Sequence, residues 1–237
     1  MIVNPAVRFA TGIVCRINEQ ELDKVPKIGP LIVAANHIGA LEVPVLVPRL
    51  ADRPMTGFAK AENWEHPFYR IIFKGWGAIP LRRGEADMTA MRAALAVLKA
   101  GEILAIAPEG TRSGDGRLRR GHPGVVVLAL KSGAPILPMV YYGGEQFKHN
   151  LRRLRRTPFN IVVGTTFYLN PGGERTTNEV RQQMVDEIMY QLAAMLPAAY
   201  RGVYSNLSLA TERYLTFPPG STSNLSPTPH PDLTAAG

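Results

Sequence analysis

The segment Leu31–Ala35 reads LIVAA and contains only apolar residues. A strand with one solvent-facing side alternates apolar and polar residues, so an uninterrupted run indicates a strand buried on both faces. Such strands are typical of sheets with helices packed on both sides. Similar strand candidates alternate with helical patterns along most of the chain. This alternation predicts the α/β class, with a largely parallel or mixed central sheet flanked by helices in a single domain.

The remaining elements follow from the same patterns. Further strands are predicted at residues 55–59, 78–81, 103–107, 136–142 and 160–167, and helices at residues 67–73, 86–100 and 123–131. Another amphipathic helix is predicted after the capping-box pattern at residues 176–179. The first 17 residues fit two interpretations, a surface-lying amphipathic segment or an ordinary packed helix or strand.

Composition sets limits on the domain organisation. The chain has 237 residues, which suits one sizeable core, and beyond Leu215 it turns to Pro, Ser, Thr and Gly. From composition alone we therefore predict one folded domain at residues 1–215 and a disordered, dispensable tail at residues 216–237. No apolar run approaches the roughly 18 residues of a membrane-spanning helix. The single Cys15 excludes an intrachain disulfide and favours a cytoplasmic setting.

The formal net charge is +8, and Asp232 is the one charged residue beyond Thr216, so residues 1–216 carry +9. A charge of this size favours phosphate-bearing partners, namely anionic lipid, nucleic acid or an acidic carrier protein. The histidines outside the first motif show no metal-ligand spacing, so we predict no metal site. They are His66, His122, His149 and His230.

Polar residues follow the buried strand directly, at Asn36-His37 and Glu42. Ligands of open α/β sheets bind outside the carboxyl ends of the strands. Residues five apart do not face each other on a helix, so His37 and Glu42 meet only if His37 lies in the turn and Glu42 in the first helical turn. A histidine with a carboxylate partner has the parts of a general base and its orienting group. The alternative is an ordinary structural histidine.

Two basic turns also follow predicted strands. Glu109-Gly110-Thr111-Arg112 comes after the strand at residues 103–107, and Arg82-Arg83-Gly84 after the strand at residues 78–81. Arginine can direct two donors at a phosphate or carboxylate, and glycine lets the backbone approach a ligand. Each turn could equally be a solvated surface turn. Together with the His/Glu turn they predict an anionic ligand that reacts near a base.

With these motifs in order, the chain resembles the family of 1-acylglycerol-3-phosphate acyltransferases, the glycerolipid acyltransferases with an NHxxxxD motif. Residues 36–42 resemble the first motif with Glu42 in place of the usual Asp, and residues 60–83 resemble the second. Residues 109–112 match the third motif and residues 134–138 the fourth. The resemblance extends from about residue 28 to residue 204.

The resemblance implies an O-acyltransferase that moves a fatty acyl group from acyl-CoA or acyl carrier protein to the free hydroxyl of 1-acylglycerol 3-phosphate, giving phosphatidate. His37 would be the general base and Glu42 its orienting acid. The acceptor's phosphate would be bound by residues of the basic turns: Arg112, Thr111, Gly110, Glu109, Lys60 and Arg83. For Glu109 two roles stay open, orienting Arg112 or a glycerol hydroxyl. No cofactor is implied beyond the acyl donor, and the expected location is the cytoplasmic face of the membrane, at an anionic surface, as a peripheral protein.

Two other functions remain compatible with the sequence. The first is acylation of glycerol 3-phosphate or of another lyso-lipid by the same chemistry. The second is a non-enzymatic basic protein that binds anionic membrane or nucleic acid through residues 117–120 and 152–156. These arginine clusters lack the interleaved aromatic residues of single-strand binders, so nucleic acid is not the expected partner.

Overall fold

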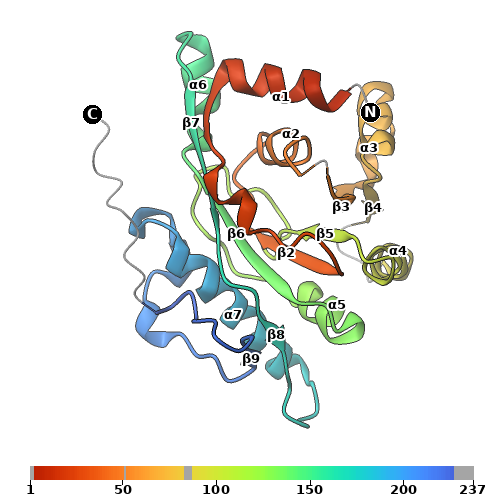
Figure 1. The fold of residues 1–237 in the computed structure, drawn as a ribbon, viewed down its shortest axis with the longest axis vertical. Coiled ribbons are helices and arrows are strands. Elements are labelled where there is room, and N and C mark those ends of the chain that lie inside the picture. Colours follow the sequence, from red (N-terminus) through yellow and green to blue (C-terminus); the bar gives the residue numbers. More distant parts are fainter. Residues whose placement is uncertain (1–2, 51, 83–86, 227–237) are drawn as a thin grey trace.

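A seven-stranded sheet forms the centre of the computed structural model, which describes residues 3–50, 52–82 and 87–226 (Figure 1). The strand order is β1-β7-β6-β2-β5-β3-β4. The strands are β1 Cys15–Asn18, β2 Leu31–Ala35, β3 Met55–Lys60, β4 Ile79–Leu81, β5 Ile103–Ile106, β6 Ile136–Tyr142 and β7 Thr157–Val163. Strands β8 Tyr168–Leu169 and β9 Leu215–Thr216 form a separate antiparallel pair.

Strand direction divides the large sheet into two groups. Strands β2, β3, β4, β5 and β6 are mutually parallel. Strand β7 runs antiparallel to β6, and β1 pairs with β7 in parallel. The predicted α/β class with a largely parallel or mixed sheet is therefore confirmed. The reversal at β7 places the beginnings of β7 and β1 at the edge where the other five strands end.

The helices have recognisable start and stop residues. They are α1 Val3–Val14, α2 Glu42–Leu46, α3 Pro67–Gly75, α4 Met88–Lys99, α5 Gly124–Ser132, α6 Phe147–Arg152 and α7 Asn178–Met195. The Asp87 side chain caps α4 by accepting from the backbone N–H groups of Thr89 and Ala90. Helix α5 ends at Gly133, whose φ of 66° is the left-handed conformation that glycine adopts without strain.

The sheet is covered on both faces, as Figure 1 shows, with α1 and α2 on one side and α5 and α7 on the other. Along β2, Ile32 and Ala34 join the core beneath α4, α5 and α7, while Leu31 and Val33 join the core beneath α2. Successive strand residues point to opposite faces, so a strand between two helical layers needs apolar residues at every position. This explains the continuous LIVAA run.

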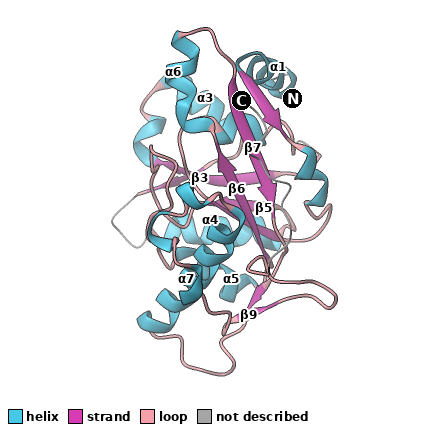
Figure 2. Ribbon diagram, turned by 90° about the vertical axis from the view of Figure 1, so that its left-hand side faces the viewer, coloured by secondary structure: helices cyan, strands magenta, loops and turns pink. Residues whose placement is uncertain are grey.

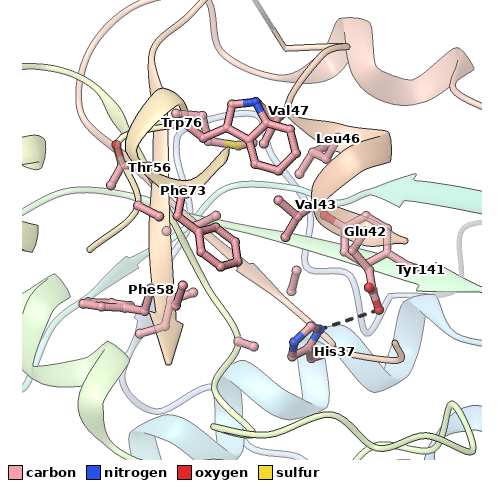
Figure 3. A pocket seen from close by; sticks show the side chains of 18 of the residues that line it. His37, Glu42, Val43, Leu46, Val47, Thr56, Phe58, Phe73, Trp76 and Tyr141 are labelled. Carbon is pink, nitrogen blue, oxygen red and sulfur yellow. Dashed lines mark ion pairs between the residues drawn. The ribbon is translucent and has the colours of Figure 1, made fainter. Parts of the chain in front are cut away.

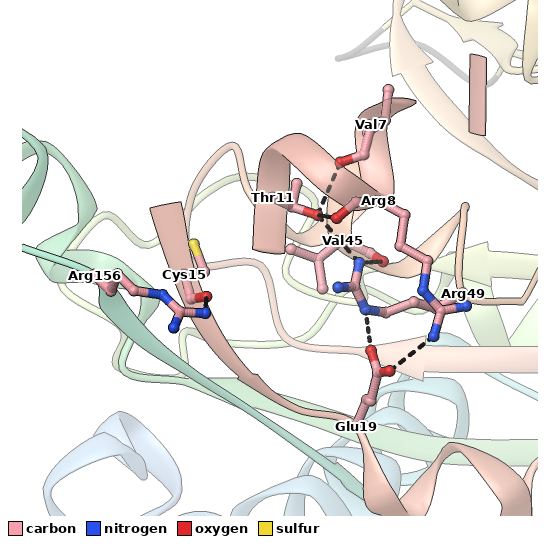
Figure 4. A network of polar contacts seen from close by, with 8 residues as sticks. All are labelled: Val7, Arg8, Thr11, Cys15, Glu19, Val45, Arg49 and Arg156. Atoms are coloured by element: carbon pink, nitrogen blue, oxygen red, sulfur yellow. Dashed lines mark hydrogen bonds and ion pairs between the residues drawn. The ribbon is translucent and has the colours of Figure 1, made fainter. Parts of the chain in front are cut away.

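Of the N-terminal segment, residues 3–18 form helix α1 followed by strand β1, and a polar network connects α1 to α2 (Figure 4). Arg49 donates to the Glu19 carboxylate, to the Val45 carbonyl oxygen at 3.0 Å and to the Thr11 hydroxyl at 3.2 Å. Arg8 donates to the other oxygen of Glu19 at 2.9 Å. The polar side of α1 is thereby held against the body of the protein.

Residues 216–226 were predicted to be disordered, but in the structure they contact the folded domain. Phe217 packs against the core, with its ring centroid 5.7 Å from that of Phe167. Asn224 accepts from the backbone N–H of Thr165 at 2.7 Å and donates to the Gln191 side chain at 2.8 Å. The buried Gln191 needs such a partner, because an unpaired buried amide is costly. Residues 227–237 lie outside the described part of the chain.

Candidate active site

Those predicted site residues that the structure describes come together at one edge of the sheet. Strands β2, β5 and β3 are adjacent and parallel, so their carboxyl ends meet there. His37 follows β2, the turn at residues 109–112 follows β5, and Lys60 ends β3. Arg83 lies outside the described residues, and Arg82, just before it, is exposed at the end of β4. The sheet topology thus places His37, Lys60 and the turn at residues 109–112 at the edge where ligands of open sheets bind.

Asn36 anchors the start of the His37 turn to the neighbouring strand β6. Its side-chain N–H donates to the Tyr141 carbonyl oxygen, and its side-chain oxygen accepts from the Tyr141 backbone N–H, both at 2.8 Å. The amide therefore pairs with β6 as a backbone residue would, one position beyond the end of β2. This role of Asn36 is not predictable from neighbouring residues, because its partner lies 105 residues away.

His37 and Glu42 lie as the spacing required, with His37 in the turn and Glu42 as the first residue of α2 (Figure 3). The His37 Nδ1 is 3.6 Å from the Glu42 Oε1. The same Oε1 accepts from the backbone N–H groups of Ile38 and Gly39, both at 2.6 Å. One carboxylate oxygen thus closes the turn and faces the imidazole at once. With Nδ1 toward the carboxylate, Nε2 is the nitrogen available to exchange a proton with a ligand.

The environment of Glu42 favours its ionised form. Burial raises the pKa of this carboxyl, but the neighbouring His37 side chain and the Gly39 N–H outweigh burial and leave the pKa below its ordinary value. The second oxygen, Oε2, is buried, and no hydrogen bond reaches it among the described residues. An ionised carboxylate beside Nδ1 orients the imidazole and stabilises the imidazolium that proton uptake creates.

Glu109 binds the backbone around His37 rather than solvent. Its side chain is buried, Oε1 accepts from the His37 N–H at 2.9 Å, and Oε2 accepts from the Arg119 N–H at 2.9 Å. Burial raises the pKa of this carboxyl despite the two N–H donors. The Ser113 N–H donates in turn to the His37 carbonyl oxygen at 2.8 Å. Glu109 was expected among the phosphate-binding residues, whereas these contacts make it a link between the His37 turn and residues 113–119.

The cations of the site face outward. Thr111 and Arg112 are exposed, and Gly110 adopts a φ of 66°, which turns the chain sharply after Glu109. Lys60 is also exposed and pairs with Glu62 at 3.2 Å. Exposed cations next to a buried carboxylate–histidine pair suit a ligand that carries its negative charge at the surface and its reacting group deeper.

An apolar cavity of about 170 Å³ opens beside His37 and Glu42. Figure 3 shows its walls, which come from α2, β3, α3 and the turn after it, and include Val43, Leu46, Val47, Phe58, Phe73 and Trp76. These residues come from separate segments and share no motif, so the sequence does not predict the cavity. Its lining suits a hydrocarbon chain whose reactive end lies at His37.

Neither a metal cluster nor a membrane-spanning helix is found in the described part of the chain. Within residues 3–50, 52–82 and 87–226, no group of three or more His, Cys, Asp or Glu side chains is arranged to hold a metal ion. In the same part of the chain, no helix combines the length and the apolar character needed to cross a bilayer.

Known proteins similar to this chain include acyltransferases. A family model described as Acyltransferase matches residues 16–142, which include His37, Glu42 and the turn at residues 109–112. The chain belongs to this acyltransferase family. Among curated proteins, it is 31% identical over 178 residues to a 1-acyl-sn-glycerol-3-phosphate acyltransferase of Borreliella burgdorferi, covering 70% of this chain and 69% of the relative.

Three further proteins extend the comparison. A protein of the same name from Bacillus subtilis is 27% identical over 143 residues, covering 60% of this chain and 69% of the relative. A lyso-ornithine lipid O-acyltransferase of Pseudomonas aeruginosa is 32% identical over 111 residues, 46% of this chain and 42% of its own length. The crystal structure of PlsC, the 1-acyl-sn-glycerophosphate acyltransferase of Thermotoga maritima, matches with a TM-score of 0.57 at 24% identity, over 78% of this chain and 74% of that one. This last match supports the fold.

Proposed function

We propose that this acyltransferase moves a fatty acyl group from a thioester donor, acyl-CoA or acyl carrier protein, to the free hydroxyl of 1-acylglycerol 3-phosphate. The observation that carries the proposal is the His37–Glu42 pair at the mouth of an apolar cavity, with Arg112 on the neighbouring turn. The names of the Borreliella burgdorferi and Bacillus subtilis relatives support the acceptor.

In the proposed reaction, Nε2 of His37 removes the proton from the acceptor hydroxyl as its oxygen attacks the thioester carbonyl carbon. The tetrahedral intermediate collapses, the carbon–sulfur bond breaks, and the leaving thiolate takes the proton from the imidazolium. Glu42 holds Nδ1 and stabilises the positive ring during this cycle. The ester oxygen comes from the acceptor and the sulfur leaves with the donor, so no covalent acyl-enzyme is required.

Binding divides between the two halves of the site. We assign the acceptor's phosphate to Gly110, Thr111 and Arg112, with Lys60 and Arg83 as further cations, and the acyl chain to the apolar cavity. A planar arginine matches two phosphate oxygens, and a backbone freed by glycine approaches closely. Because the acceptor is a lipid and the donors are water-borne, we place the protein as a peripheral protein at an anionic membrane surface on the cytoplasmic side. The proposal requires no cofactor other than the donor.

Direct assay tests the proposal. Purified protein is offered labelled acyl-CoA or acyl carrier protein with lysophosphatidate, glycerol 3-phosphate or an uncharged lyso-lipid in turn. We expect turnover with lysophosphatidate to exceed that with the other acceptors, and His37→Ala to abolish it. Preference for an acceptor without phosphate would overturn the acceptor assignment, and salt-sensitive nucleic-acid binding without any turnover would overturn the activity.

A further inference from the structure

Two segments of the chain contain basic residues and no acidic ones. Residues 3–18 and residues 146–160 contain no Asp or Glu, while together they contain Arg8, Arg16, Lys148, Arg152, Arg153, Arg155 and Arg156. They are far apart in sequence but adjacent in the fold, because β1 pairs with β7 from Cys15 opposite Thr157 onward. Arg156 joins them further by donating to the carbonyl oxygen of Gly12 at 2.6 Å and to that of Cys15 at 2.7 Å. Figure 4 shows the contact with Cys15.

Both segments lie toward the catalytic edge of the sheet. Strand β7 is antiparallel to β6, with Asn160 opposite Tyr142, so the loop before β7 stands where β6 and its neighbour β2 end. Strand β1 is parallel to β7 and begins at the same edge, which brings the end of α1 there. Figures 1 and 2 show α1 and α6 together at one end of the molecule in both views.

The same region exposes large apolar side chains. Leu154 is 94% exposed and has a φ of 53°, a left-handed conformation that leucine rarely adopts. Leu151 beside it is 46% exposed, and on α1 Phe9 and Ile13 are 73% and 57% exposed. The network around Arg49 and Glu19 holds the opposite side of α1 inward. We call these four apolar residues, with Arg152, Arg153 and Arg155, the α1/α6 surface.

We propose that the α1/α6 surface lies against an anionic lipid bilayer, with Leu154 inserted among the acyl chains and the three arginines in contact with lipid phosphates. This extends the proposed function, because the acceptor would then reach His37 directly from the membrane. A projecting leucine suits a lipid surface, which yields to it, whereas a folded protein partner would need a matching pocket. Apolar groups flanked by arginines are typical of interfacial binding, since arginine keeps its charge at the headgroups.

Vesicle binding of the full chain tests this surface. R152S/R153S/R155S removes three charges, and R92S/K99S/K131S removes three exposed charges from α4 and α5 as the matched control. Each basic residue near an anionic bilayer raises affinity roughly five-fold, so we expect the first variant to lose on the order of 100-fold in binding to phosphatidylglycerol vesicles. The control should lose far less, because solution ions screen charges that lie away from the membrane. Neutral phosphatidylcholine vesicles should bind all three proteins weakly.

Leu154→Asn tests the apolar contact without disturbing the loop, because asparagine tolerates the left-handed conformation. We expect weaker binding to phosphatidylglycerol vesicles, with a melting temperature equal to that of the parent. The proposal is overturned if R152S/R153S/R155S binds these vesicles like the control, if Leu154→Asn binds like the parent, or if the arginine variant loses affinity for an acidic acyl carrier protein instead.

The result is independent of the proposed activity. Vesicle binding needs no turnover, so a protein that binds through this surface but acylates nothing would refute the activity alone. If both proposals hold, R152S/R153S/R155S should retain turnover with acceptor dispersed in neutral detergent micelles and lose it with acceptor in anionic vesicles.

Discussion

A single oxygen atom, the Glu42 Oε1, connects the fold of the active-site turn to its chemistry. It closes the turn through the N–H groups of Ile38 and Gly39 and faces the His37 Nδ1 at 3.6 Å. The side chain reaches all three because it projects from the first residue of a helix back over the preceding turn. Charge and turn geometry therefore make separable contributions at this position, and substitutions can distinguish them.

Glu42→Gln keeps the volume of the side chain and an oxygen for the turn but removes the charge beside the imidazole. We expect turnover to fall about 10²-fold or more, by analogy with the acid of catalytic triads. Glu42→Asp keeps the charge and withdraws it by one methylene, about 1.5 Å, so turnover should stay above that of the glutamine variant. Steady-state kinetics measures both, with His37→Ala as the inactive reference. A glutamine variant equal to the parent would exclude Glu42 from the mechanism.

Glu109→Gln replaces one acceptor oxygen with an N–H₂ donor that must face a backbone N–H of His37 or Arg119. Losing a buried hydrogen bond costs about 1–3 kcal/mol, so we expect turnover to fall while KM for the acceptor stays constant. Glu102→Gln, at the other end of β5, is the control. A rise in acceptor KM with constant turnover would instead favour the role of orienting a glycerol hydroxyl.

Arg112→Ala should weaken use of a phosphate-bearing acceptor far more than use of the acyl donor. A hydrogen bond to a charged group contributes about 1.5–3 kcal/mol, so kcat/KM for lysophosphatidate should fall roughly 10- to 100-fold. Arg117→Ala, exposed in the following loop, is the matched control. Equal losses for phosphate-bearing and uncharged acceptors would show that Arg112 does not bind the phosphate.

At the scale of elements, the C-terminal segment is where the structure departs most from the sequence prediction. Residues 216–226 are rich in Pro, Ser and Thr, yet Phe217 and Asn224 attach them to the core and to α7. We expect Asn224→Ala to cost about 1–3 kcal/mol, because the Gln191 oxygen and the Thr165 N–H each lose a partner. The melting temperature should fall by about 2–4 °C per kcal/mol, and Ser221→Ala should leave it unchanged. An unchanged value for Asn224→Ala would restore the picture of a dispensable tail.

Local patterns predicted the elements whose cause is local. The apolar run of β2, the glycine that ends α5 and the placement of Glu42 at the start of α2 each follow from neighbouring residues. The capping residue of α7 is Thr177, one position later than the capping-box pattern indicated. The roles of Asn36, Glu109 and Asn224 were not predictable, because each depends on a backbone group 59 to 105 residues away. The cavity was not predictable either, because its walls come from separate segments of the chain.

For the whole molecule, the stability of the fold depends on pH through two buried carboxyls, Glu42 and Glu109, whose contributions change with pH in opposite directions. The pKa of Glu42 is lowered, so its contribution is present above the unfolded pKa of about 4.3 and is lost as pH falls through the folded value. The pKa of Glu109 is raised, so its contribution is complete below about 4.3 and is lost as pH rises through the folded value.

Melting temperatures across the range of about pH 3 to 8 check this assignment. Glu42→Gln should reduce the fall in stability on acidification, and Glu109→Gln should reduce the fall as pH rises above about 4.3. The two variants should therefore change the slope on opposite sides of the curve. Parallel curves for the parent and both variants would contradict the two pKa directions.

The Asn36–Tyr141 pairing also bears on when the active site forms during folding. It joins residues 105 positions apart, and the Glu109 contact with His37 joins residues 72 positions apart. Contacts across long stretches of chain form slowly, because the loop entropy is lost before the contact stabilises anything. We therefore expect the His37 turn to acquire its shape only after β5 and β6 have docked beside β2. A nascent or refolding chain should form its local helices early and the His37 turn late. If His37 is the general base we propose, an incompletely folded chain would not yet present it to the acyl donor.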